Sequence, residues 1–592
     1  MNQKLRNHKQ SLFTVLLLCL FLSSEALGAD NTSPGQLTSH ATVNSIGLEW
    51  EINGDDNHDA QCQIQYRISG RDQWHGFMPL YRVDYNGANT LAGSILFLEP
   101  GTSYEINLVL SDPDGGFENR TETITTRSIP LLPAGGRVFH VTPGSGGGDG
   151  SSGNPFQGIA TAQSIAGPGD IFLLHEGNYG GEIEFNVSGA PGSYIVWKGA
   201  GSGAAVIDGI RVNADYIWLE NLKVTNRDYA LLTYSSPEGV VIKGNEFINC
   251  HYSICLNHGG NNWHIVDNTI TGDQIPGECI DSACWSGEGI ELDHTSGHVV
   301  AYNTISQVAD GISYPHKNCD IFGNDIFDTS DDGIEIDYGY ANIRVWQNRI
   351  SNPKNNGISF QPVNGAPWYV LRNQVAAPNE DAIKFRGADR ALIAHNTFVG
   401  WSGVEASGSC YLSRVQSNNN LWISVQPRYA WECGYDDGFE PFWGYNLDYD
   451  GFDWSGYSYF AKWKGIRYET IEAFTIATGL EEHGIMVDKA SCFEIFETAQ
   501  PPASMPAQYM TLNIGCNAVD AGIPLAGIND DYSGIAPDLG AYEINTPLPH
   551  YGVRKIDYDN DGDVDGSDLA ALAALQSGLR ELLTVFIVRF GT

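Results

Sequence analysis

Hydrophobic and polar positions alternate in short runs along most of this chain, which is the pattern of β-strands rather than of helices. Between residues 37 and 127 the runs are separated by turn signals such as Asn53-Gly54, and we expect a β-sandwich over residues 34–130. From Gly136 to about residue 425 the runs are shorter and recur at a nearly constant length. The pattern therefore predicts an all-β protein with two differently built parts.

Asparagines mark the repeat of the second part. Most lie 21 to 25 residues apart, at Asn221, Asn245, Asn268, Asn303, Asn324, Asn348, Asn373, Asn396 and Asn420. Coils of this length stack about 4.8 Å apart, so equivalent residues form ladders. Asparagine suits the turns because it tolerates the left-handed conformation, and stacked asparagine side chains hydrogen-bond to one another. A leucine-rich-repeat horseshoe would need a leucine spacing and helical halves that the sequence lacks. We predict a right-handed parallel β-helix over residues 136–425, preceded by the sandwich and closed by an extension and cap over residues 426–548.

Both parts resemble known families. The repeat, with phrases such as Gly-Asn245-Glu-Phe and Tyr-Asn303-Thr-Ile, resembles the pectate-lyase-like superfamily of right-handed parallel β-helices. Trp50 and the run Leu98-Glu-Pro-Gly-Thr-Ser-Tyr104 resemble a fibronectin type III domain and its tyrosine corner. The first resemblance implies a groove for long carbohydrate chains, and the second implies a spacer or docking module. Neither defines a reaction, because one fold hosts many.

The net charge and the first residues indicate which partners the protein has and where it is located. The formal net charge is −39, which argues against nucleic acid as a partner because phosphates would be repelled. Residues 1–28 read as an export signal, with an apolar run from Leu12 to Leu22 and the small residues Ala26 and Gly28 before the cleavage point. We therefore expect a secreted protein. No other segment reaches 18 apolar residues, so we expect no membrane span.

An acidic run near the C-terminus has the spacing of an EF-hand calcium loop. Its predicted Ca²⁺ ligands are Asp557, Asp559, Asp561, Asp563, Asp565 and Asp568, with Gly562 at the position that needs glycine. Residues 553–575 resemble one half of a dockerin module, which would imply a cohesin-like or cell-surface partner. A dockerin pairs two such loops, and this sequence holds one.

A second motif, Gly-Ile-x-apolar-x, follows the asparagine in successive coils. It occurs as Gly289-Ile-Glu-Leu-Asp293, Gly311-Ile-Ser-Tyr-Pro315, Gly333-Ile-Glu-Ile-Asp337, Gly357-Ile-Ser-Phe-Gln361 and Ala382-Ile-Lys-Phe-Arg386. The isoleucine and the next apolar residue should point inward, so the x positions should form columns facing solvent. The residues just before each motif are Glu288, Asp310, Asp332, Asn356 and Asp381, so one face gathers acids and then bases.

This face carries the candidate chemistry. We predict catalytic residues at Lys384, Arg386, Glu291, Asp293, Glu335, Asp337, His294 and His316. Substrate contacts are predicted at Trp285, His258, Lys317 and Gln361; the three histidines at 258, 294 and 316 should stack in consecutive coils. Trp285 lies in a surplus of residues, Thr271 to Ser286, that holds Cys279 and Cys284 and could form a disulfide-stapled rim of the groove.

Two reactions suit these residues. Glu291 should lie about 6.7 Å from Asp293 and about 9.6 Å from Glu335 between Cα atoms, close to the spacing of an inverting glycosidase pair. The same carboxylates could instead hold Ca²⁺, with Lys384 as a base whose pKa Arg386 lowers. The second arrangement resembles polysaccharide lyases. We predict a lyase that cleaves by β-elimination, with an inverting glycoside hydrolase or a non-catalytic glycan-binding surface or adhesion protein as the alternatives.

Overall fold

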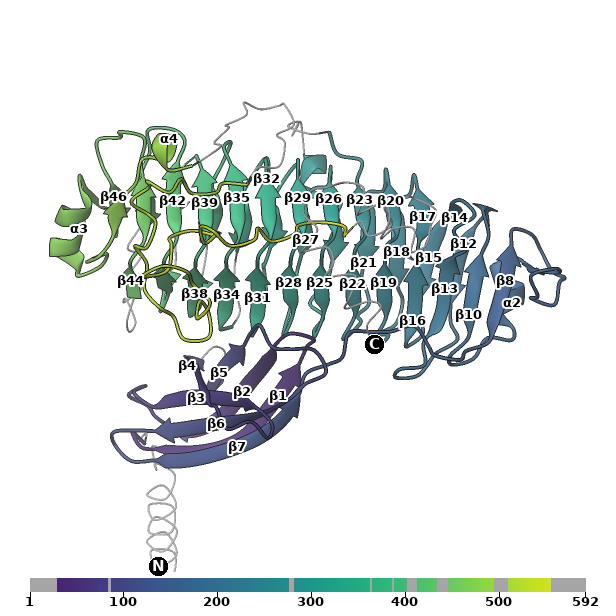
Figure 1. Ribbon diagram of the computed structural model, residues 1–592, viewed down its shortest axis with the longest axis horizontal. Coiled ribbons are helices and arrows are strands. Elements are labelled where there is room, and N and C mark those ends of the chain that lie inside the picture. Colours follow the sequence, from purple (N-terminus) through teal and green to yellow (C-terminus); the bar gives the residue numbers. More distant parts are fainter. Residues whose placement is uncertain are drawn as a thin grey trace, which may run out of the picture.

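The structure is a computed structural model that describes residues 29–83, 87–275, 282–361, 365–385, 388–401, 412–433, 446–493 and 509–554. The predicted export signal, Arg386 and the six predicted ligands of the calcium loop lie outside the described residues. Figure 1 shows a long stack of coils with an antiparallel β domain against one side. The predicted fold class, a parallel β-helix preceded by a β-sandwich, is confirmed.

The antiparallel domain is a sandwich of seven strands in the order β1-β2-β5-β4-β3-β6-β7. The strands are β1 (Thr32–Ala41), β2 (Ile46–Gly54), β3 (Gln61–Ile68), β4 (His75–Val83), β5 (Thr90–Ile95), β6 (Ser103–Ser111) and β7 (Phe117–Thr125). Trp50 is fully buried at its centre. The hydroxyl of Tyr104 accepts a hydrogen bond from the backbone N–H of Glu99 at 2.8 Å, which is the contact expected of a tyrosine corner. Membership of the fibronectin type III family stays a prediction.

The solenoid is built from three parallel sheets. The sandwich-side sheet contains β8 (Val138–Thr142), β9 (Phe156–Gln157), β10 (Ile171–Leu174), β13 (Ile195–Gly199), β16 (Ile217–Glu220), β19 (Val241–Lys243), β22 (His264–Val266), β25 (Val299–Ala301), β28 (Asp320–Phe322), β31 (Ile343–Trp346), β34 (Trp368–Leu371), β38 (Ala391–Ala394), β41 (Gln416–Asn418) and β44 (Asn446–Asp448). The middle sheet contains β11 (Gly177–Asn178), β14 (Ala205–Ile207), β17 (Leu222–Thr225), β20 (Glu246–Ile248), β23 (Thr269–Thr271), β26 (Thr304–Ser306), β29 (Asp325–Phe327), β32 (Arg349–Ser351), β35 (Gln374–Ala377), β39 (Thr397–Gly400), β42 (Leu421–Ser424), β45 (Gly451–Asp453) and β48 (Ile485–Met486).

The third sheet, here called the short sheet, carries the Gly-Ile motif. Its strands are β12 (Glu182–Phe185), β15 (Gly209–Val212), β18 (Tyr229–Thr233), β21 (Tyr252–Cys255), β24 (Ile290–Glu291), β27 (Ile312–Ser313), β30 (Ile334–Glu335), β33 (Ile358–Phe360) and β36 (Ile383–Phe385). The isoleucines of the motif stack inside the coil at full burial, at Ile254, Ile290, Ile312, Ile334, Ile358 and Ile383. Glycine precedes them because a Cβ on Gly311 would lie 2.4 Å from the carbonyl of Gly333 and 2.6 Å from a methyl of Ile326.

The asparagine ladder runs through eight coils. In each step the Oδ1 of one asparagine accepts hydrogen bonds from both the backbone N–H and the Nδ2 of the asparagine one coil earlier, from Asn245 through Asn268, Asn303, Asn324, Asn348, Asn373 and Asn396 to Asn420. Asp450 receives the last pair of bonds. Buried amides therefore satisfy each other along the whole stack.

Two details of the predicted repeat were wrong. Asn221 is exposed and lies one residue out of register, because Leu222 occupies the ladder position and donates its N–H to Asn245. The left-handed residue is the one before each ladder asparagine, as at Tyr302, with φ 56°, and Gln347, with φ 50°. The asparagines are thus selected for hydrogen bonding along the stack rather than for the turn conformation.

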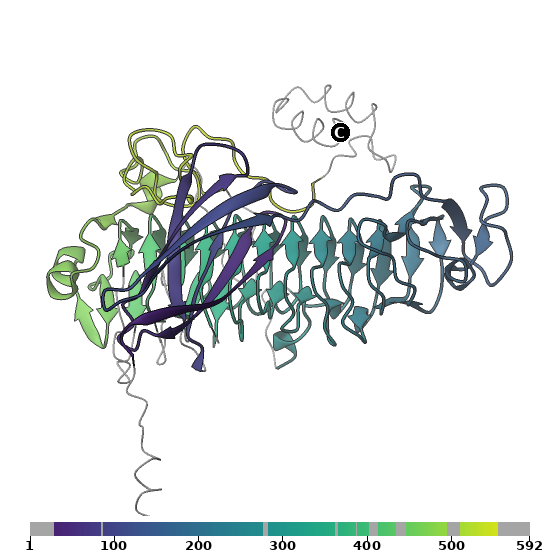
Figure 2. The same cartoon turned by 90° about the horizontal axis from the view of Figure 1, so that it is seen from below.

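The sandwich packs on the outer face of the sandwich-side sheet, and Figure 2 shows its strands crossing the coils. Its core is continuous with outward residues of the solenoid, among them Val299, Phe322 and Trp346. A polar network also joins the two parts. Asp320 on β28 accepts hydrogen bonds from Arg344 at 2.5 Å, from Ser45 at 3.1 Å and from the hydroxyl of Thr42. Asp320 and Arg344 are completely buried.

The ends of the solenoid are closed by different elements. The short helix α2 (Ile159–Gln163) packs Ile159 and Ala162 against the core at the N-terminal end. Beyond residue 425, where we predicted that the coils end, β44 and β45 continue the parallel pairing, because Asp450 replaces the ladder asparagine. The other described elements are η2 (Ser282–Trp285), β37 (Ala388–Asp389), β40 (Leu412–Ser413), β43 (Trp431–Cys433), β46 (Ala461–Trp463), β47 (Ile466–Tyr468), α3 (Ile471–Thr478) and α4 (Lys489–Cys492).

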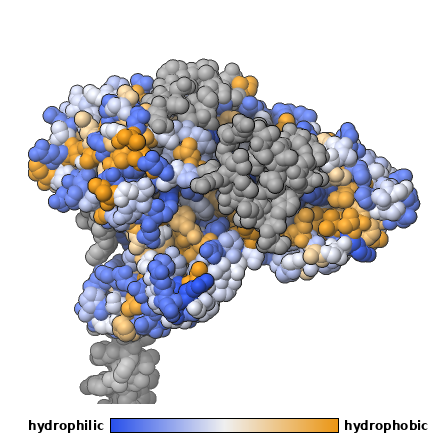
Figure 3. Space-filling model, viewed as in Figure 1, coloured by the Kyte–Doolittle hydropathy of each residue, from blue (hydrophilic) through white to orange (hydrophobic). Residues whose placement is uncertain are grey.

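The surface agrees with the acidic composition. Hydrophilic residues dominate the face drawn in Figure 3, and apolar side chains gather toward the two ends of the solenoid. A disulfide joins Cys492 to Cys516 in the C-terminal extension, whereas Cys62, Cys250, Cys255 and Cys319 are free and buried. Among the described residues, the helices are all too short or too polar to cross a membrane.

Candidate functional site

Strand pairing in the short sheet aligns the predicted column of side chains. Cys255 pairs with Glu291, Glu291 with Ser313, Ser313 with Glu335, Glu335 with Ser359, and Ser359 with Lys384. The stacking predicted from the motif is confirmed for these positions. The column is more enclosed than predicted, however, because Ser313 and Ser359 are fully buried and Lys384 is only 7% exposed. The side chains on the outer side of this sheet are therefore largely covered by neighbouring residues.

A second row of side chains lies just before the strands and is here called the acid row: Glu288, Asp310, Asp331, Asp332 and Asn356. Each main member accepts a backbone N–H from the next coil, Glu288 from Asp310 at 3.3 Å and Asp310 from Asp332 at 2.8 Å. Asp332 accepts from Asn356 at 2.7 Å. This ladder buries carboxylates one coil apart, although like charges at that spacing repel.

The repulsion and the burial appear in the pKa values. Burial, together with the charge of Glu291, raises the pKa of Glu288 to about 8. Burial, with Glu288 and Glu335 nearby, raises the pKa of Asp310 well above its ordinary value. Burial and Asp332 raise the pKa of Asp331 to about 7. Carboxylates in this state gain most from a cation that neutralises them together.

The neighbouring column shows the same effect. Burial, with Asp337 and Asp332 nearby, raises the pKa of Glu335 to about 9. Burial raises the pKa of Asp337 to about 7, although Lys384 opposes the shift. Burial also raises the pKa values of Glu291 and Asp293. All four predicted carboxylates thus share one acidic surface with the acid row.

The acid row fits a calcium ion. Calcium binds six to eight oxygen atoms at 2.3–2.6 Å, so two oxygens on one ion lie at most about 5 Å apart. One oxygen each from Asp310, Asp331 and Asp332 lies within 4.8 Å of the others. Glu335 adds an Oε2 atom that is buried without a hydrogen-bond partner among the described residues. The three aspartates have the spacing to hold Ca²⁺, and Glu335, whose charge acts on Asp310, is the nearby candidate for a fourth ligand.

Lys384 lies against this cluster. Its Nζ is 3.3 Å from Asp332 Oδ2, and the side chain is 9% exposed. We predicted that Arg386 lowers the pKa of Lys384, and this is wrong: burial lowers the pKa, but Asp332, Asp337 and Asp331 outweigh it, so the pKa is raised. Arg386 itself lies outside the described residues. The sequence shows the nearest basic residue, whereas the fold surrounds Lys384 with acids from earlier coils.

The predicted histidines lie along the other side of the strands. The rings of His294 and His316 are 6.2 Å apart and perpendicular, whereas His258 contacts Tyr234 at 5.6 Å. Burial, with His294 and Lys317 nearby, lowers the pKa of His316. The three histidines follow three consecutive strands as predicted, but ring contact is described for one pair. Their catalytic and substrate-binding roles stay predictions.

The remaining predicted contacts are placed unequally. Trp285 ends η2 and is 61% exposed, and the backbone carbonyl of Cys284 beside it accepts a hydrogen bond from Ser330. The backbone N–H of Gln361 donates to Asp337 at 2.6 Å. Lys317 instead forms an ion pair with Glu49 of the sandwich at 2.8 Å, so its ammonium is already engaged away from the acid row.

The sequence prediction missed the centre of the site. Asp310 and Asp332 were visible as the residues before each motif, but they were not among the predicted catalytic or metal residues. Asp331 had no signal apart from its place beside Asp332. Their position is the signal that could have found them. The glycine of each Gly-Ile motif faces the inside of the coil, so the residue before it faces outward at the corner of the coil.

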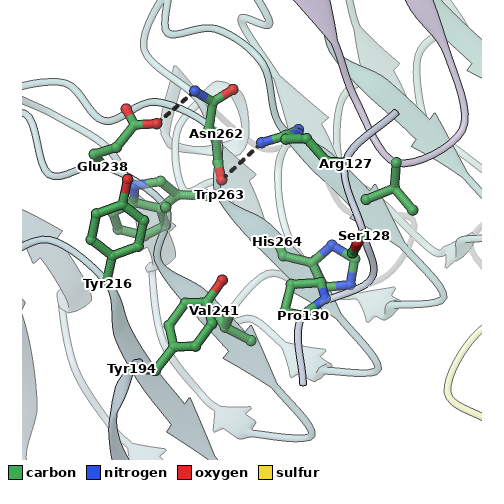
Figure 4. A pocket seen from close by; sticks show the side chains of 12 residues that line it. Arg127, Ser128, Pro130, Tyr194, Tyr216, Glu238, Val241, Asn262, Trp263 and His264 are labelled. Carbon is green, nitrogen blue, oxygen red and sulfur yellow. Dashed lines mark hydrogen bonds between the residues drawn. The ribbon is translucent and has the colours of Figure 1, made fainter. Parts of the chain in front are cut away.

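A separate pocket lies between the segment after the sandwich and the coils (Figure 4). Its volume is about 150 Å³, and Tyr194, Tyr216 and Trp263 line it together with Arg127. Arg127 donates hydrogen bonds to the backbone carbonyls of Asn262 and Gly297. The groups of this pocket are engaged in fastening the segment to the coils, so we place the chemistry on the short sheet.

The fold and the site together define a parallel β-helix protein with a cluster of acidic side chains on its short sheet. Residues 208–364 and 288–424 match the family model described as a right handed beta helix region. The matched residues include the strands of the short sheet from β18 to β36. The central part of the chain is therefore a right-handed parallel β-helix.

Two curated proteins are similar to part of the chain. Pectate lyase L of Dickeya chrysanthemi is 32% identical over 115 residues, which is 16% of this chain and 27% of that protein. Pectate lyase L of Dickeya dadantii (strain 3937) is 30% identical over 115 residues, with the same coverage. The match thus spans about a quarter of each relative. A solved redesigned β-sandwich protein covers 16% of this chain and 90% of its own, at 16% identity and a TM-score of 0.12, which does not establish a shared fold.

Proposed function

We propose that this protein is a secreted, calcium-dependent polysaccharide lyase that cleaves a uronate-containing polymer by β-elimination. One observation carries the proposal: two buried carboxylates and one half-buried carboxylate have oxygens within 4.8 Å of one another, and a lysine ammonium lies 3.3 Å from one of them. The β-helix fold and the similarity to two proteins named pectate lyase support a polysaccharide substrate.

The residues present suit the reaction. A calcium ion held by Asp310, Asp331, Asp332 and Glu335 would neutralise a uronate carboxylate and so acidify the hydrogen on the adjacent carbon. Lys384 Nζ, in its neutral form, takes that proton. The electron pair left behind forms the C4–C5 double bond, the C4–O bond breaks, and the departing sugar oxygen takes a proton from solvent. Lys384 then holds the abstracted proton beside Asp332.

The acids also decide when Lys384 can act. The ammonium form of Lys384 is stabilised by Asp332, Asp337 and Asp331. Lys384 must lose this proton before it can act as a base. Carboxylates that ligate a cation no longer support that form, so the proton on Lys384 becomes easier to lose. The surrounding burial then favours the neutral amine, because burial lowers the pKa of a lysine.

The competing reaction is an inverting hydrolysis. Its supporting observation is Glu335, whose pKa of about 9 leaves the side chain protonated at neutral pH, as a general acid must be. Glu291, two coils away on the same column, would then be the general base.

One experiment separates the readings. The full-length protein is incubated with a panel of polyuronates and neutral polysaccharides, with calcium or with a chelator. Elimination gives ultraviolet absorbance from the new double bond together with new reducing ends, and we expect it only with calcium and only on uronates. Reducing ends without absorbance would replace the lyase with a hydrolase. Binding without either product would make the groove a glycan-binding surface.

A further inference from the structure

The short sheet carries a row of rings opposite the acid row. This row, here called the aromatic row, consists of Tyr234, His258, His294, His316 and Tyr338, each placed just after a strand of the sheet. The ring of His316 is half-buried, and the other four residues are exposed. Tyr234 is 54% exposed and Tyr338 is 47% exposed. Such large exposed side chains in one line need an explanation beyond packing.

The rings support one another along the solenoid axis. His258 contacts Tyr234 at 5.6 Å, and His294 contacts Tyr338 at 5.9 Å with perpendicular planes. Tyr314 lies 5.5 Å from His294 and fills the space between the coils. The contacts hold the exposed rings in place, so a ligand that packs on them does not have to order them first.

The row borders the groove without being covered. Lys317, next to His316, is drawn toward the sandwich by Glu49 and lies over the ring of Tyr340 at 5.4 Å. Tyr338, in the next coil, stays exposed.

The two rows differ in what they can recognise. The acid row and its cation would attract carboxylates, whereas the aromatic row offers apolar ring surface with polar edges. A sugar ring has one apolar face of C–H groups and a polar rim, so it can satisfy both rows at once. The span from the coil of Tyr234 to that of Tyr338 is four steps, or about 19 Å.

We propose that the aromatic row is the sugar-stacking wall of the groove, with the polysaccharide lying along the solenoid axis, its ring faces on Tyr338 and Tyr234 and its carboxylates toward the acid row. This inference rests on the proposed function and adds the direction and minimum length of the bound chain. Tyr338 shares a coil with Glu335 and contacts the sugars nearest the reaction. Tyr234 contacts only chains long enough to reach four coils away.

The test compares Tyr338→Ala and Tyr234→Ala on oligouronates of increasing length and on the polymer. We expect Tyr338→Ala to raise KM about three- to tenfold on all lengths, and Tyr234→Ala to raise it only on the longest oligomers and the polymer. Tyr338→Phe and Tyr234→Phe keep the ring and should restore binding. Phe117→Ala, at a 69% exposed side chain on the sandwich, is the control for general surface effects.

Binding is also measured directly, by calorimetry with Lys384→Ala, so that affinity does not depend on turnover. Equal affinities of wild type and both alanine variants for every length, in a protein that cleaves polyuronate, would overturn the aromatic wall and leave the lyase standing. A wild type that neither cleaves nor binds any polyuronate would overturn the lyase and the wall together. Far-ultraviolet circular dichroism checks that the variants are folded.

Discussion

Two outer faces of the same solenoid bury acidic side chains, but the two faces differ in how the charges of these side chains are compensated. Under the sandwich, Asp320 accepts hydrogen bonds from Arg344, Ser45 and Thr42, so its charge is paired with a guanidinium inside an interface. On the short sheet, the acid row and its neighbours place several carboxylates together, and Lys384 is the one ammonium described against them.

The difference shows on which face the protein's own residues compensate the buried charges. A buried charge costs several kcal/mol unless a partner compensates it, so a chain that supplies all the partners is building an interface. On the short sheet the described residues gather several acids around one lysine, so a cation from outside would lower the cost of burying them. The raised pKa values of Glu288 and Glu335 reflect that cost.

The largest effect should follow from removing the base on the short sheet. Lys384→Ala should lower kcat on polyuronate about 10²- to 10⁴-fold, because proton transfer by a positioned group contributes that much. The measurement is the rate of absorbance growth at saturating calcium. Lys462→Ala is the matched control, since Lys462 pairs with Glu432 at 3.0 Å outside the short sheet. An unchanged rate would mean that Lys384 only balances the charge of the acids and is not the base.

The covered face should respond in stability instead. Arg344→Ala leaves Asp320 buried without its main partner, and we expect the free energy of unfolding to fall by about 3–5 kcal/mol. The control is Arg67→Ala, whose pair with Glu105 is partly exposed and should contribute less than about 1 kcal/mol. Denaturant unfolding followed by fluorescence measures both. Similar losses for the two variants would mean that the network under the sandwich is not a closed unit.

Much of the short sheet could be predicted from the sequence. A period of 21 to 25 residues and the Gly-Ile motif place Glu291, Glu335 and Lys384 in one column, because each strand repeats the register of its neighbour. Local periodicity carries this information, since residues in equivalent coils must stack.

The state of the site could not be predicted in the same way. The pKa of Lys384 depends on Asp331, Asp332 and Asp337, which are 47 to 53 residues away in the chain. The interface that pairs Asp320 depends on where the sandwich docks, and no repeat in the solenoid encodes that. The repeat also could not fix the register to a single residue, because Leu222 rather than Asn221 occupies the ladder position.

A smaller effect is expected when one carboxylate of the short sheet is replaced by an amide of the same shape, which removes the charge alone. Asp310→Asn should raise the thermal midpoint of the calcium-free protein by a few degrees, because it removes one of the repelling carboxylates. The amide oxygen of an asparagine can still accept the backbone N–H of Asp332, as Asn373 accepts the backbone N–H of Asn348 in the asparagine ladder. Calcium should raise the midpoint of the wild type but not of the variant. A calcium shift that survives in Asp310→Asn would place the ion elsewhere.

The smallest effect is a difference in pH dependence between the two faces. On the sandwich side, burial and Arg127 lower the pKa of His40 to about 4. A histidine with a depressed folded pKa contributes stability above its unfolded value of 6.5, and that stability is lost as pH falls through about 4. On the short sheet, the pKa of Glu335 is about 9, so its contribution is present below 4.5 and is lost as pH rises through about 9.

The thermal midpoint of the calcium-free protein should therefore fall on both sides of a maximum, with a different face responsible for each limb. Saturating calcium should flatten the alkaline limb only, because the acids that weaken the short sheet would then be neutralised. His40 lies on β1 of the sandwich and has no reason to respond. His40→Gln should flatten the acid limb and leave the calcium effect unchanged. If calcium flattened the acid limb instead, the acids that it neutralises would not be those of the short sheet, and the contrast between a paired and an unpaired face would fail.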